Sequence, residues 1–432
     1  MLPEAEGRLR CRRLFCAQNR HGVPPRRIWL RGRQRCDRRG CAGEDWCVRM
    51  KRICVIGAVV CCLLAVSVPA SAAGLGEVKA KSAILTTEDG QVLFEQNADE
   101  ALPPASVTKI MTMLLTMEAV DSGKASLDDL VTASAHAAEM GGSQIYLKEG
   151  EQMTLDDMLK SIAVASANDA AVAVAEHLGG SEETFVSMMN ERAKELGCTG
   201  TTFVNPNGLD TDGEETRTTA ADLAKMSAEL LRHEKILEYT SIWMDTVRDG
   251  AFGLANTNKM LRLYDGMIGL KTGYTSTAGY CISAVAERDG MRLIAVVLGE
   301  PDKESRNSDI TAMLNYGFAN YAMADILEDG QKLDSVPVEL GMQSSVSVQL
   351  ADDAPILMEK AGAEGLEREI IQENSVQAPV KQGEKLGEVV LRRGEEEIAR
   401  RDIVAAEDVA RKGISAIYRD LLAYLLMKRQ AF

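Results

Sequence analysis

The chain has 432 residues, of which 46% are hydrophobic and 26% charged, an ordinary composition for a folded soluble protein that excludes wholesale disorder. Its length suggests two or three domains. The net charge of −15 is unevenly spread along the chain. Residues 1–52 hold 15 Lys and Arg and 5 Asp and Glu, whereas the remainder holds 34 Lys and Arg and 59 Asp and Glu. Because phosphates repel so acidic a body, the composition argues against a nucleic-acid-binding protein.

The N-terminal region combines an unusual leader with an export signal. Residues 1–49 are rich in Arg and Cys and have neither helical nor strand periodicity, so we interpret them as a mis-assigned leader, with translation beginning at Met50. A basic start, an uncharged run over 53–68 and a small-residue site ending at Ala72 are typical of a secretory signal peptide. We therefore expect residues 50–72 to be removed on export. The alternative is an uncleaved anchor helix, for which the apolar run is short.

Cysteine usage excludes a disulfide-dense scaffold. Eight of the ten cysteines precede residue 63, and only Cys198 and Cys281 lie in the body of the chain. Cys281 falls on a predicted core strand, and nothing in the sequence places Cys198 beside it. We expect both to be buried thiols.

The first part of the body predicts a hairpin followed by helices. Residues 83–85 and 92–94 flank Glu88-Asp89-Gly90 and predict two antiparallel strands. The segment 107–120 predicts a helix that is apolar nearly all round and therefore buried. Three further helices are expected: one opened by a Thr154 cap, one over 169–177 and one over 182–196.

Strands return later in the body. Residues 267–270 predict a strand, and 280–286 with 293–298 predict a second hairpin around Asp289-Gly290. A helix is expected over 310–322. Strands at both ends with helices between them predict an α/β (α+β) fold, built as an antiparallel sheet with a large helical insertion.

The sequence changes character near residue 333. Short strands at close spacing, separated by glycines, predict a small all-β domain of the sandwich type over 333–405. The expected strands lie at 336–340, 346–350, 356–358, 369–371 and 388–391. The tail, 406–432, predicts an amphipathic helix that is too charged and too short to span a bilayer. We expect it to lie on a membrane surface, and docking on the protein's own β-domain is the alternative.

The first motif that carries chemistry is Ser106-Val107-Thr108-Lys109, at the start of the buried helix. A separation of three residues places Ser106 and Lys109 on the same helix face. A lysine surrounded by apolar groups loses its proton more easily than a free one, so it can accept the serine hydroxyl proton and create a nucleophile. Alone the Ser-x-x-Lys pattern is common by chance. A lysine on an otherwise apolar helix is unusual, however, and favours a functional role for this one.

Two further motifs follow. Ser166-Ala167-Asn168 stands at a break between helices, where the hydroxyl can relay a proton and the amide can hold a substrate carbonyl. Lys271-Thr272-Gly273 stands at the end of a predicted strand. Lys271 and the hydroxyls of Thr272 and Thr275 can bind a carboxylate, and Gly273 would let a substrate backbone approach the strand closely.

The three motifs, in this order and behind a signal peptide, resemble the set found in penicillin-recognising serine enzymes. The chain is similar to low-molecular-mass penicillin-binding proteins, which are serine-type D-alanyl-D-alanine carboxypeptidases of the S11 type. The resemblance runs from about residue 75 to the C-terminus. It includes Pro103-Pro104-Ala105 before the serine, the β-domain and the amphipathic tail. It implies a penicillin-binding/β-lactamase-like transpeptidase fold over 73–332.

The resemblance also implies the activity and the partners. Such an enzyme removes the terminal D-alanine from peptidoglycan stem pentapeptides through an acyl-enzyme on its serine, and β-lactam antibiotics acylate the same residue. It acts on the extracytoplasmic face of the cytoplasmic membrane, which the C-terminal helix would contact. The implied roles are nucleophile for Ser106, general base for Lys109, and proton transfer and orientation for Ser166 and Asn168. The implied substrate-binding residues are Lys271, Thr272, Gly273, Tyr274, Thr275 and Arg306, with the backbone N–H groups of Ser106 and Tyr274 as the oxyanion hole.

Two other functions of the same fold remain as alternatives. A serine β-lactamase needs a glutamate-positioned water for deacylation, and no convincing Glu-x-x-Leu-Asn segment lies between Asn168 and Lys271. A wall-binding protein without turnover is the second alternative, although all three motifs are intact. The four histidines are scattered and form no His-Glu-x-x-His pattern, so we expect neither a metal nor a cofactor.

Overall fold

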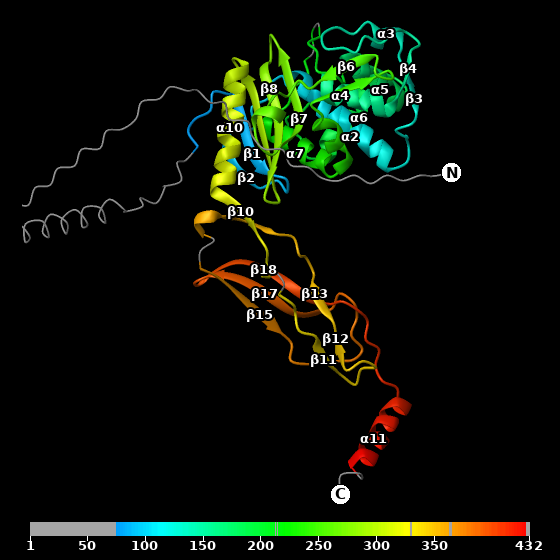
Figure 1. Cartoon of the computed structure of the whole chain (residues 1–432), viewed down its shortest axis with the longest axis vertical. Coiled ribbons are helices and arrows are strands. Elements are labelled where there is room, and N and C mark those ends of the chain that lie inside the picture. Colours follow the sequence, from blue (N-terminus) through cyan, green and yellow to red (C-terminus); the bar gives the residue numbers. More distant parts are fainter. Residues whose placement is uncertain (1–74, 212, 214, 329–330, 363–364, 429–432) are drawn as a thin grey trace, which may run out of the picture. The chain divides into compact units, whose positions relative to one another are not determined.

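A five-stranded antiparallel sheet is the centre of the larger region, residues 75–320. The structure is a computed structural model that describes residues 75–428 except 212, 214, 329–330 and 363–364 (Figure 1). The predicted leader and signal peptide lie outside the described residues. The strands, in the spatial order β2-β1-β9-β8-β7, are β2 (Val92–Gln96), β1 (Ser82–Thr87), β9 (Met291–Glu300), β8 (Gly279–Arg288) and β7 (Met267–Thr275). Both predicted hairpins and the α/β fold class are confirmed.

Alternate residues of the central strand β9 face two different layers. Ile294 and Val296 pack into the core formed with the inserted helices, whereas Ala295 and Val297 pack against α10 (Lys303–Asn320). This period of two is what a strand buried on both faces requires. Figure 1 shows the same layering, with α10 on one face of the sheet and the helical insertion on the other.

The insertion between β2 and β7 holds the remaining helices of this region. The predicted helices are confirmed, and Thr154 caps α4 by accepting a hydrogen bond from the Asp157 N–H. The helix α7, which packs against the sheet, was not predicted. The helical elements are η1 (Ala105–Thr108), α2 (Lys109–Asp121), α3 (Ala135–Ala138), α4 (Leu155–Ala165), α5 (Asn168–Gly179), α6 (Glu182–Glu195), α7 (Ala220–Leu231), η2 (Glu234–Ile236), α8 (Leu237–Thr240) and α9 (Met260–Leu263). The insertion also contains two small antiparallel strand pairs: β3 (Leu130–Thr132) with β4 (Gln152–Thr154), and β5 (Met244–Val247) with β6 (Phe252–Ala255).

Two element boundaries differ from the prediction in ways that affect the site. Helix α10 begins at Lys303, seven residues earlier than expected, because the Asp302 side chain accepts a hydrogen bond from the Ser305 N–H and caps the helix. Strand β7 continues to Thr275, because it pairs with β8 along its whole length. The Lys-Thr-Gly motif therefore lies within a strand and not at its end.

The described part of the C-terminal β region, residues 321–411, contains three further sheets. One has the order β12-β11-β16, with β11 at Val336–Glu339, β12 at Ser345–Val346 and β16 at Val376–Gln377. Another has the order β13-β18-β17-β15, with β13 at Val348–Leu350, β15 at Leu366–Gln372, β17 at Lys385–Arg393 and β18 at Glu396–Ala405. Strand β18 was not predicted, since charged residues fill much of it. The predicted strand at 356–358 is β14 (Ile356–Glu359), which pairs with β10 (Tyr321–Ala324) as the third sheet and is followed by η3 (Lys360–Gly362).

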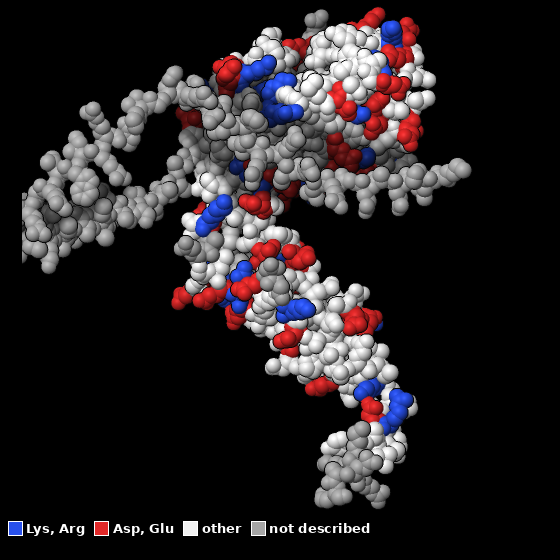
Figure 2. Space-filling model, in the orientation of Figure 1, with Lys and Arg blue, Asp and Glu red and all other residues white. Residues whose placement is uncertain are grey.

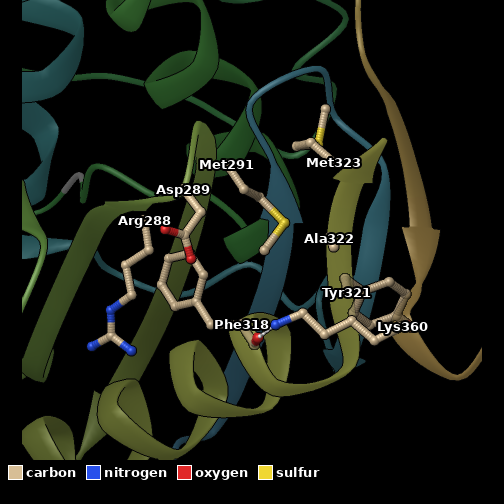
Figure 3. A pocket seen from close by; sticks show the side chains of 8 residues that line it. All are labelled: Arg288, Asp289, Met291, Phe318, Tyr321, Ala322, Met323 and Lys360. Atoms are coloured by element: carbon tan, nitrogen blue, oxygen red, sulfur yellow. Dashed lines mark hydrogen bonds between the residues drawn. The ribbon is translucent and has the colours of Figure 1, made fainter. Parts of the chain in front are cut away.

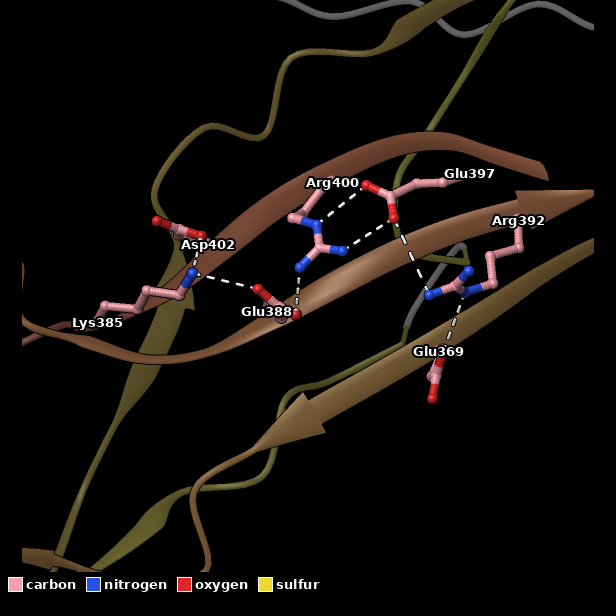
Figure 4. A network of polar contacts seen from close by, with 7 residues as sticks. All are labelled: Glu369, Lys385, Glu388, Arg392, Glu397, Arg400 and Asp402. Carbon is pink, nitrogen blue, oxygen red and sulfur yellow. Dashed lines mark hydrogen bonds and ion pairs between the residues drawn. The ribbon is translucent and has the colours of Figure 1, made fainter. Parts of the chain in front are cut away.

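Charged side chains form a network across β15, β17 and β18 (Figure 4). Lys385 lies 2.7 Å from Asp402 and 3.2 Å from Glu388, and Arg400 bridges Glu388 and Glu397. Oppositely charged neighbours on adjacent strands support a solvated sheet face. This pairing explains how so charged a sequence forms regular strands.

The tail differs from the prediction at its start. Val409 and Arg411 form bridges to the β region, so helix α11 covers Ile414–Lys428 and not the whole tail. Its large apolar residues are exposed: Ile414, Ile417, Tyr418, Leu421, Leu422, Tyr424, Leu425 and Leu426. The structure therefore does not show α11 docked on the β region. None of the helices described here combines the length and apolarity that a bilayer crossing requires.

Candidate active site

One cavity, of about 530 Å³, brings together the serine motifs and the β7 motif. It lies where η1, the start of α5, strand β7 and the first turn of α10 meet. The residues predicted from sequence that line it are Ser106, Ser166, Thr272, Gly273, Tyr274 and Arg306. Lys109, Asn168 and Lys271 lie buried behind this lining.

Ser106 and Lys109 are in direct contact. Ser106 belongs to the 3₁₀ helix η1, and Lys109 is the first residue of α2, so the pair spans a change of helix type. Lys109 Nζ lies 2.9 Å from Ser106 Oγ. Ala105 adopts a φ of +50°, which is unusual for a residue other than glycine, and turns the chain directly before the serine.

The surroundings of Lys109 suit a neutral amine. Its side chain is 0% exposed, and burial lowers its pKa well below the ordinary value, with a further contribution from the charge of Lys271. Nζ also donates to Asn168 Oδ1 at 2.6 Å and to the Asn207 carbonyl at 2.7 Å. A neutral amine has two N–H groups for these two acceptors, which leaves its lone pair for the hydroxyl proton of Ser106.

Sequence reasoning missed Asn207, because it contributes a backbone carbonyl that any residue type has. The turn that carries it is held by Asn205 Oδ1, which accepts from the N–H groups of Asn207 and Gly208. At Gly208, φ is +77°, and a Cβ there would lie 1.9 Å from the Ala105 carbonyl oxygen. The Asn205-Pro206-Asn207-Gly208 turn was the available signal, and its glycine lets the turn pack against the nucleophile segment.

The second motif lies at the break between α4 and α5. Ser166 adopts the left-handed conformation at φ +62° and ends α4, which turns the chain toward the cavity. Asn168 is 2% exposed, and its side-chain amide donates to the Gly141 carbonyl at 2.7 Å while its oxygen accepts from Lys109. The buried Asp169 holds the neighbouring loop by accepting from the N–H groups of Ile145 and Leu147.

Strand β7 supplies a second buried lysine. Lys271 is 1% exposed and donates to the Thr272 carbonyl at 2.7 Å. Burial, assisted by the charge of Arg306, lowers the pKa of Lys271 to about 7. The hydroxyl of Thr272 donates to that of Thr257 at 2.8 Å, and both residues line the cavity.

The structure gives Gly273 a packing role, and the expected close approach of a substrate stays a prediction. A Cβ at this position would lie 2.6 Å from the Pro104 carbonyl oxygen and 3.0 Å from Ser106 N. The chain segment that approaches β7 closely is therefore the one that carries the nucleophile. Glycine is required for the strand to pack beside Ser106, whether or not a substrate is bound.

Arg306 lies in the first turn of α10 and lines the cavity. It is 3% exposed, and its Nε and Nη2 atoms both donate to Asn307 Oδ1, at 3.3 and 3.0 Å. Burial lowers its pKa, and the buried guanidinium has no carboxylate partner among the described residues. A buried cation without a counter-charge is costly, so its position favours an anionic ligand.

The two remaining predicted residues differ in their placement. Tyr274 is 56% exposed at the cavity mouth, with its ring centroid 4.3 Å from that of Tyr280. Thr275 is not among the lining residues; its hydroxyl accepts a hydrogen bond from the Ala278 N–H and holds the turn between β7 and β8. The structure thus gives Thr275 a turn-forming contact in place of the expected position in the cavity.

A second cavity, of about 220 Å³, contains none of the predicted residues (Figure 3). Its basic groups are engaged: Arg288 stacks on the Phe318 ring at 4.9 Å, and Lys360 Nζ donates to the Phe318 carbonyl at 2.7 Å. Both basic side chains of this cavity are therefore already in contact with Phe318.

Metal-ligand side chains and thiols do not enter the site. Within residues 75–428 as described, no three His, Cys, Asp or Glu side chains are grouped to hold a metal ion. Cys198 and Cys281 are both buried and free, which confirms the prediction for them.

Comparisons with known proteins agree with the motifs. A family model described as D-alanyl-D-alanine carboxypeptidase matches residues 66–302, and one described as penicillin-binding protein 5, C-terminal domain, matches residues 321–411. The chain is 44% identical over 340 residues to the D-alanyl-D-alanine carboxypeptidase DacF of Bacillus subtilis, covering 78% of this chain and 87% of that protein.

Two solved structures extend the comparison. Penicillin-binding protein 5 from Haemophilus influenzae has 30% identity and a TM-score of 0.64, over 78% of this chain and 98% of that chain. Penicillin-binding protein D2 from Listeria monocytogenes, in its ampicillin-bound form, has 36% identity and a TM-score of 0.52, over 56% of this chain and 98% of that chain.

Proposed function

This chain belongs to the D-alanyl-D-alanine carboxypeptidase family, and from that membership we propose that it removes the terminal D-alanine from peptidoglycan stem pentapeptides through an acyl-enzyme on Ser106. The observation that carries the proposal is the buried Lys109 amine, 2.9 Å from Ser106 Oγ, with its pKa lowered by burial. This arrangement supplies a nucleophile and its base without a histidine.

The proposed acylation step uses one proton. Lys109 takes the proton of Ser106 as Oγ attacks the carbonyl carbon of the penultimate D-alanine. The backbone N–H groups of Ser106 and Tyr274 stabilise the developing oxyanion, and the packing of Gly273 against this segment supports that assignment. The proton then passes to the departing amine through Lys109 and Ser166, and Asn168 orients the acyl part of the substrate.

The proposed substrate carboxylate lies on the Arg306 side of the cavity. Lys271, Thr272 and Arg306 supply two cations and a hydroxyl, and none of the residues that line this cavity is acidic. The contact of Thr275 with the Ala278 N–H supports an indirect role for this residue in shaping the turn. In deacylation, Lys109 activates water, and the hydrolysed acyl group leaves Ser106 with its proton restored.

The β-lactamase alternative lacks support in the cavity. Deacylation in class A β-lactamases depends on a glutamate that positions water. The residues that line this cavity include no Asp or Glu. We instead propose that β-lactams acylate Ser106 and are released slowly, so that they act as inhibitors. The ampicillin-bound form of the Listeria relative supports this proposal.

We also propose where the enzyme acts, from a signal peptide near the N-terminus and helix α11 near the C-terminus. Residues 50–72 would direct export and be removed after Ala72, and α11 would hold the enzyme on the extracytoplasmic face of the membrane. The exposed apolar residues of α11, such as Leu421 and Leu425, support surface attachment.

The test of the activity is release of D-alanine from an acyl-Lys-D-Ala-D-Ala peptide by the purified protein. We expect release from the unaltered protein and none from Ser106→Ala, because the acyl-enzyme cannot form without the hydroxyl. A Ser106→Ala variant that still releases D-alanine at the original rate would contradict the proposal. A folded protein that releases none would favour the wall-binding alternative.

A further inference from the structure

The active-site cavity is positively charged in an acidic protein. Its lining includes three basic residues, Lys259, Lys303 and Arg306, and no acidic residue, although the chain carries a net charge of −15. In Figure 2, basic side chains gather near the upper ends of α10 and β8. Such a concentration of one sign of charge favours an anionic ligand.

None of these three cations has a carboxylate partner among the described residues. Arg306 donates to the neutral Asn307 side chain. Lys259 Nζ donates to the Asn256 carbonyl at 2.9 Å and lies 4.7 Å from the centre of the Trp243 ring. Lys303 is exposed, and its side chain forms no hydrogen bond or ion pair within the described part of the chain.

Two carboxyl groups closely precede Arg306 in the chain, those of Asp302 and Glu304, and neither forms an ion pair with the three basic residues of the cavity within the described part of the chain. The Asp302 side chain instead caps α10. The carboxyl group whose charge would act on Arg306 is that of Glu300. Glu300 is fully buried, and both its side-chain oxygens lack a hydrogen-bond partner. Burial and the neighbouring Asp309 raise its pKa to about 8, so this group is mostly protonated at pH 7. The positive charge of the cavity is therefore available to a ligand.

Lys259 and Lys303 lie on the side of the cavity to which the proposed function assigns the departing residue. Lys259 follows Thr257, whose hydroxyl lies 2.8 Å from that of Thr272. Lys303 precedes Arg306 by three residues on α10, which places both on one helix face. One terminal carboxylate can be held by Lys271, Thr272 and Arg306, which leaves two lysines beyond the needs of D-alanine.

We propose that Lys259 and Lys303 form a second anion position for the departing residue. The enzyme then releases C-terminal D-amino acids that carry an acidic side chain better than their neutral isosteres. This inference rests on the proposed function and uses the same chemistry: Ser106 Oγ bonds to the carbonyl carbon, the bond to the departing nitrogen breaks, and the amine leaves with the serine proton. Water then hydrolyses the ester. Substrates of this class are acyl-D-alanyl-D-amino acids with a second carboxylate on the last residue.

The expected preference is modest because both lysines are solvent-exposed. Ion pairs at such positions are weakened by water and salt, so we expect roughly a three- to tenfold higher kcat/KM for the acidic substrate. The preference should shrink as ionic strength rises, since screening acts over about 10 Å at 0.1 M salt.

The test compares acyl-Lys-D-Ala-D-Asp with acyl-Lys-D-Ala-D-Asn, which differ in charge but hardly in shape. We expect the unaltered protein to release D-aspartate faster, and the ratio of the two kcat/KM values to fall toward one in Lys259→Gln and Lys303→Gln. The exposed Lys194→Gln on α6 makes the same charge change away from the cavity and should keep the original ratio.

Cleavage of acyl-Lys-D-Ala-D-Ala distinguishes a failure of the second anion position from a failure of the proposed function. If D-alanine is released but D-aspartate and D-asparagine are released equally well, the second anion position is refuted and the proposed function stands. A ratio that persists in both lysine variants also refutes it. If none of the three peptides is cleaved, the proposed function fails and this inference fails with it.

Discussion

Lys109 and Lys271 show how burial changes what one residue type does. Both side chains are almost fully buried, and both have lowered pKa values, in each case chiefly because burial disfavours the charged form. Lys109 has acceptors for two N–H groups and faces Ser106, so its neutral form is the useful one. Lys271 lies near Arg306 where an anion is expected, so its charged form is the useful one.

The opposite needs of these lysines predict a bell-shaped pH profile. The second-order rate constant for acylation by a β-lactam should rise as Lys109 loses its proton and fall as Lys271 loses its proton, near pH 7 in the free enzyme. In Lys271→Arg the guanidinium keeps its charge, so the alkaline fall should move above pH 9 even if the maximum rate is lower. Stopped-flow acylation rates between pH 5 and 10 would measure this. An alkaline limb that stays in place would assign it to another group.

Lys271 should also lower stability in a pH-dependent way. Its pKa is about 7 in the folded protein and near the ordinary 10.5 in the unfolded chain, so the cost of burying its charge is fully present below pH 7. This cost fades as pH rises from 7 to 10.5. We therefore expect Lys271→Met to raise the free energy of unfolding at pH 6 and to raise it less at pH 10.

Denaturant titrations at the two pH values would test this stability difference. Lys194→Met, at an exposed position on α6, provides the control for the change of side chain alone. An equal gain for Lys271→Met at pH 6 and pH 10 would show that its charge is not the source of the cost.

At the scale of elements, the contact between β7 and η1 decides where the nucleophile lies. Adding a methyl group at Gly273 would bring it 2.6 Å from the Pro104 carbonyl oxygen, so the strand or the nucleophile segment must move. We expect Gly273→Ala to slow β-lactam acylation by about 100-fold, the scale of loss expected for a displacement near 1 Å. Gly253→Ala on β6, where a Cβ meets open space, should stay within about twofold of the original rate. Equal rates for both variants would contradict this account of Gly273.

The sequence predicted the parts of the site that depend on local spacing. Ser106 and Lys109 are three residues apart, so their contact needs only one turn of helix. Asn207 is 98 residues from Lys109 and acts through its carbonyl, so no side-chain pattern could assign its contact. The start of α10 could have been found from Asp302, whose side chain caps the helix three residues before Ser305.

At the scale of the whole molecule, helix α11 presents an apolar surface that nothing in the described residues covers. A chain ending at Gly413 removes α11 but keeps the bridges of Val409 and Arg411 to the β region. We expect this shortened chain to lose binding to anionic lipid vesicles in a sedimentation assay.

A point-variant pair tests whether the apolar surface of α11 is responsible. Leu421→Gln combined with Leu425→Gln should weaken vesicle binding by roughly tenfold or more, because two exposed leucines can no longer insert. Ser415→Gln on the same helix removes no apolar side chain and should bind as before. Vesicle binding that survives removal of α11 would contradict membrane attachment through this helix.

The central claim is that one serine, activated by one buried lysine, carries the acyl group. The most direct measurement is mass spectrometry of the protein after incubation with benzylpenicillin, followed by peptide mapping of the adduct. We predict a single penicilloyl group on Ser106, none in Ser106→Ala, and much slower labelling of Lys109→Met. A stable adduct on another residue such as Ser166, or undiminished labelling of Ser106→Ala, would contradict the account.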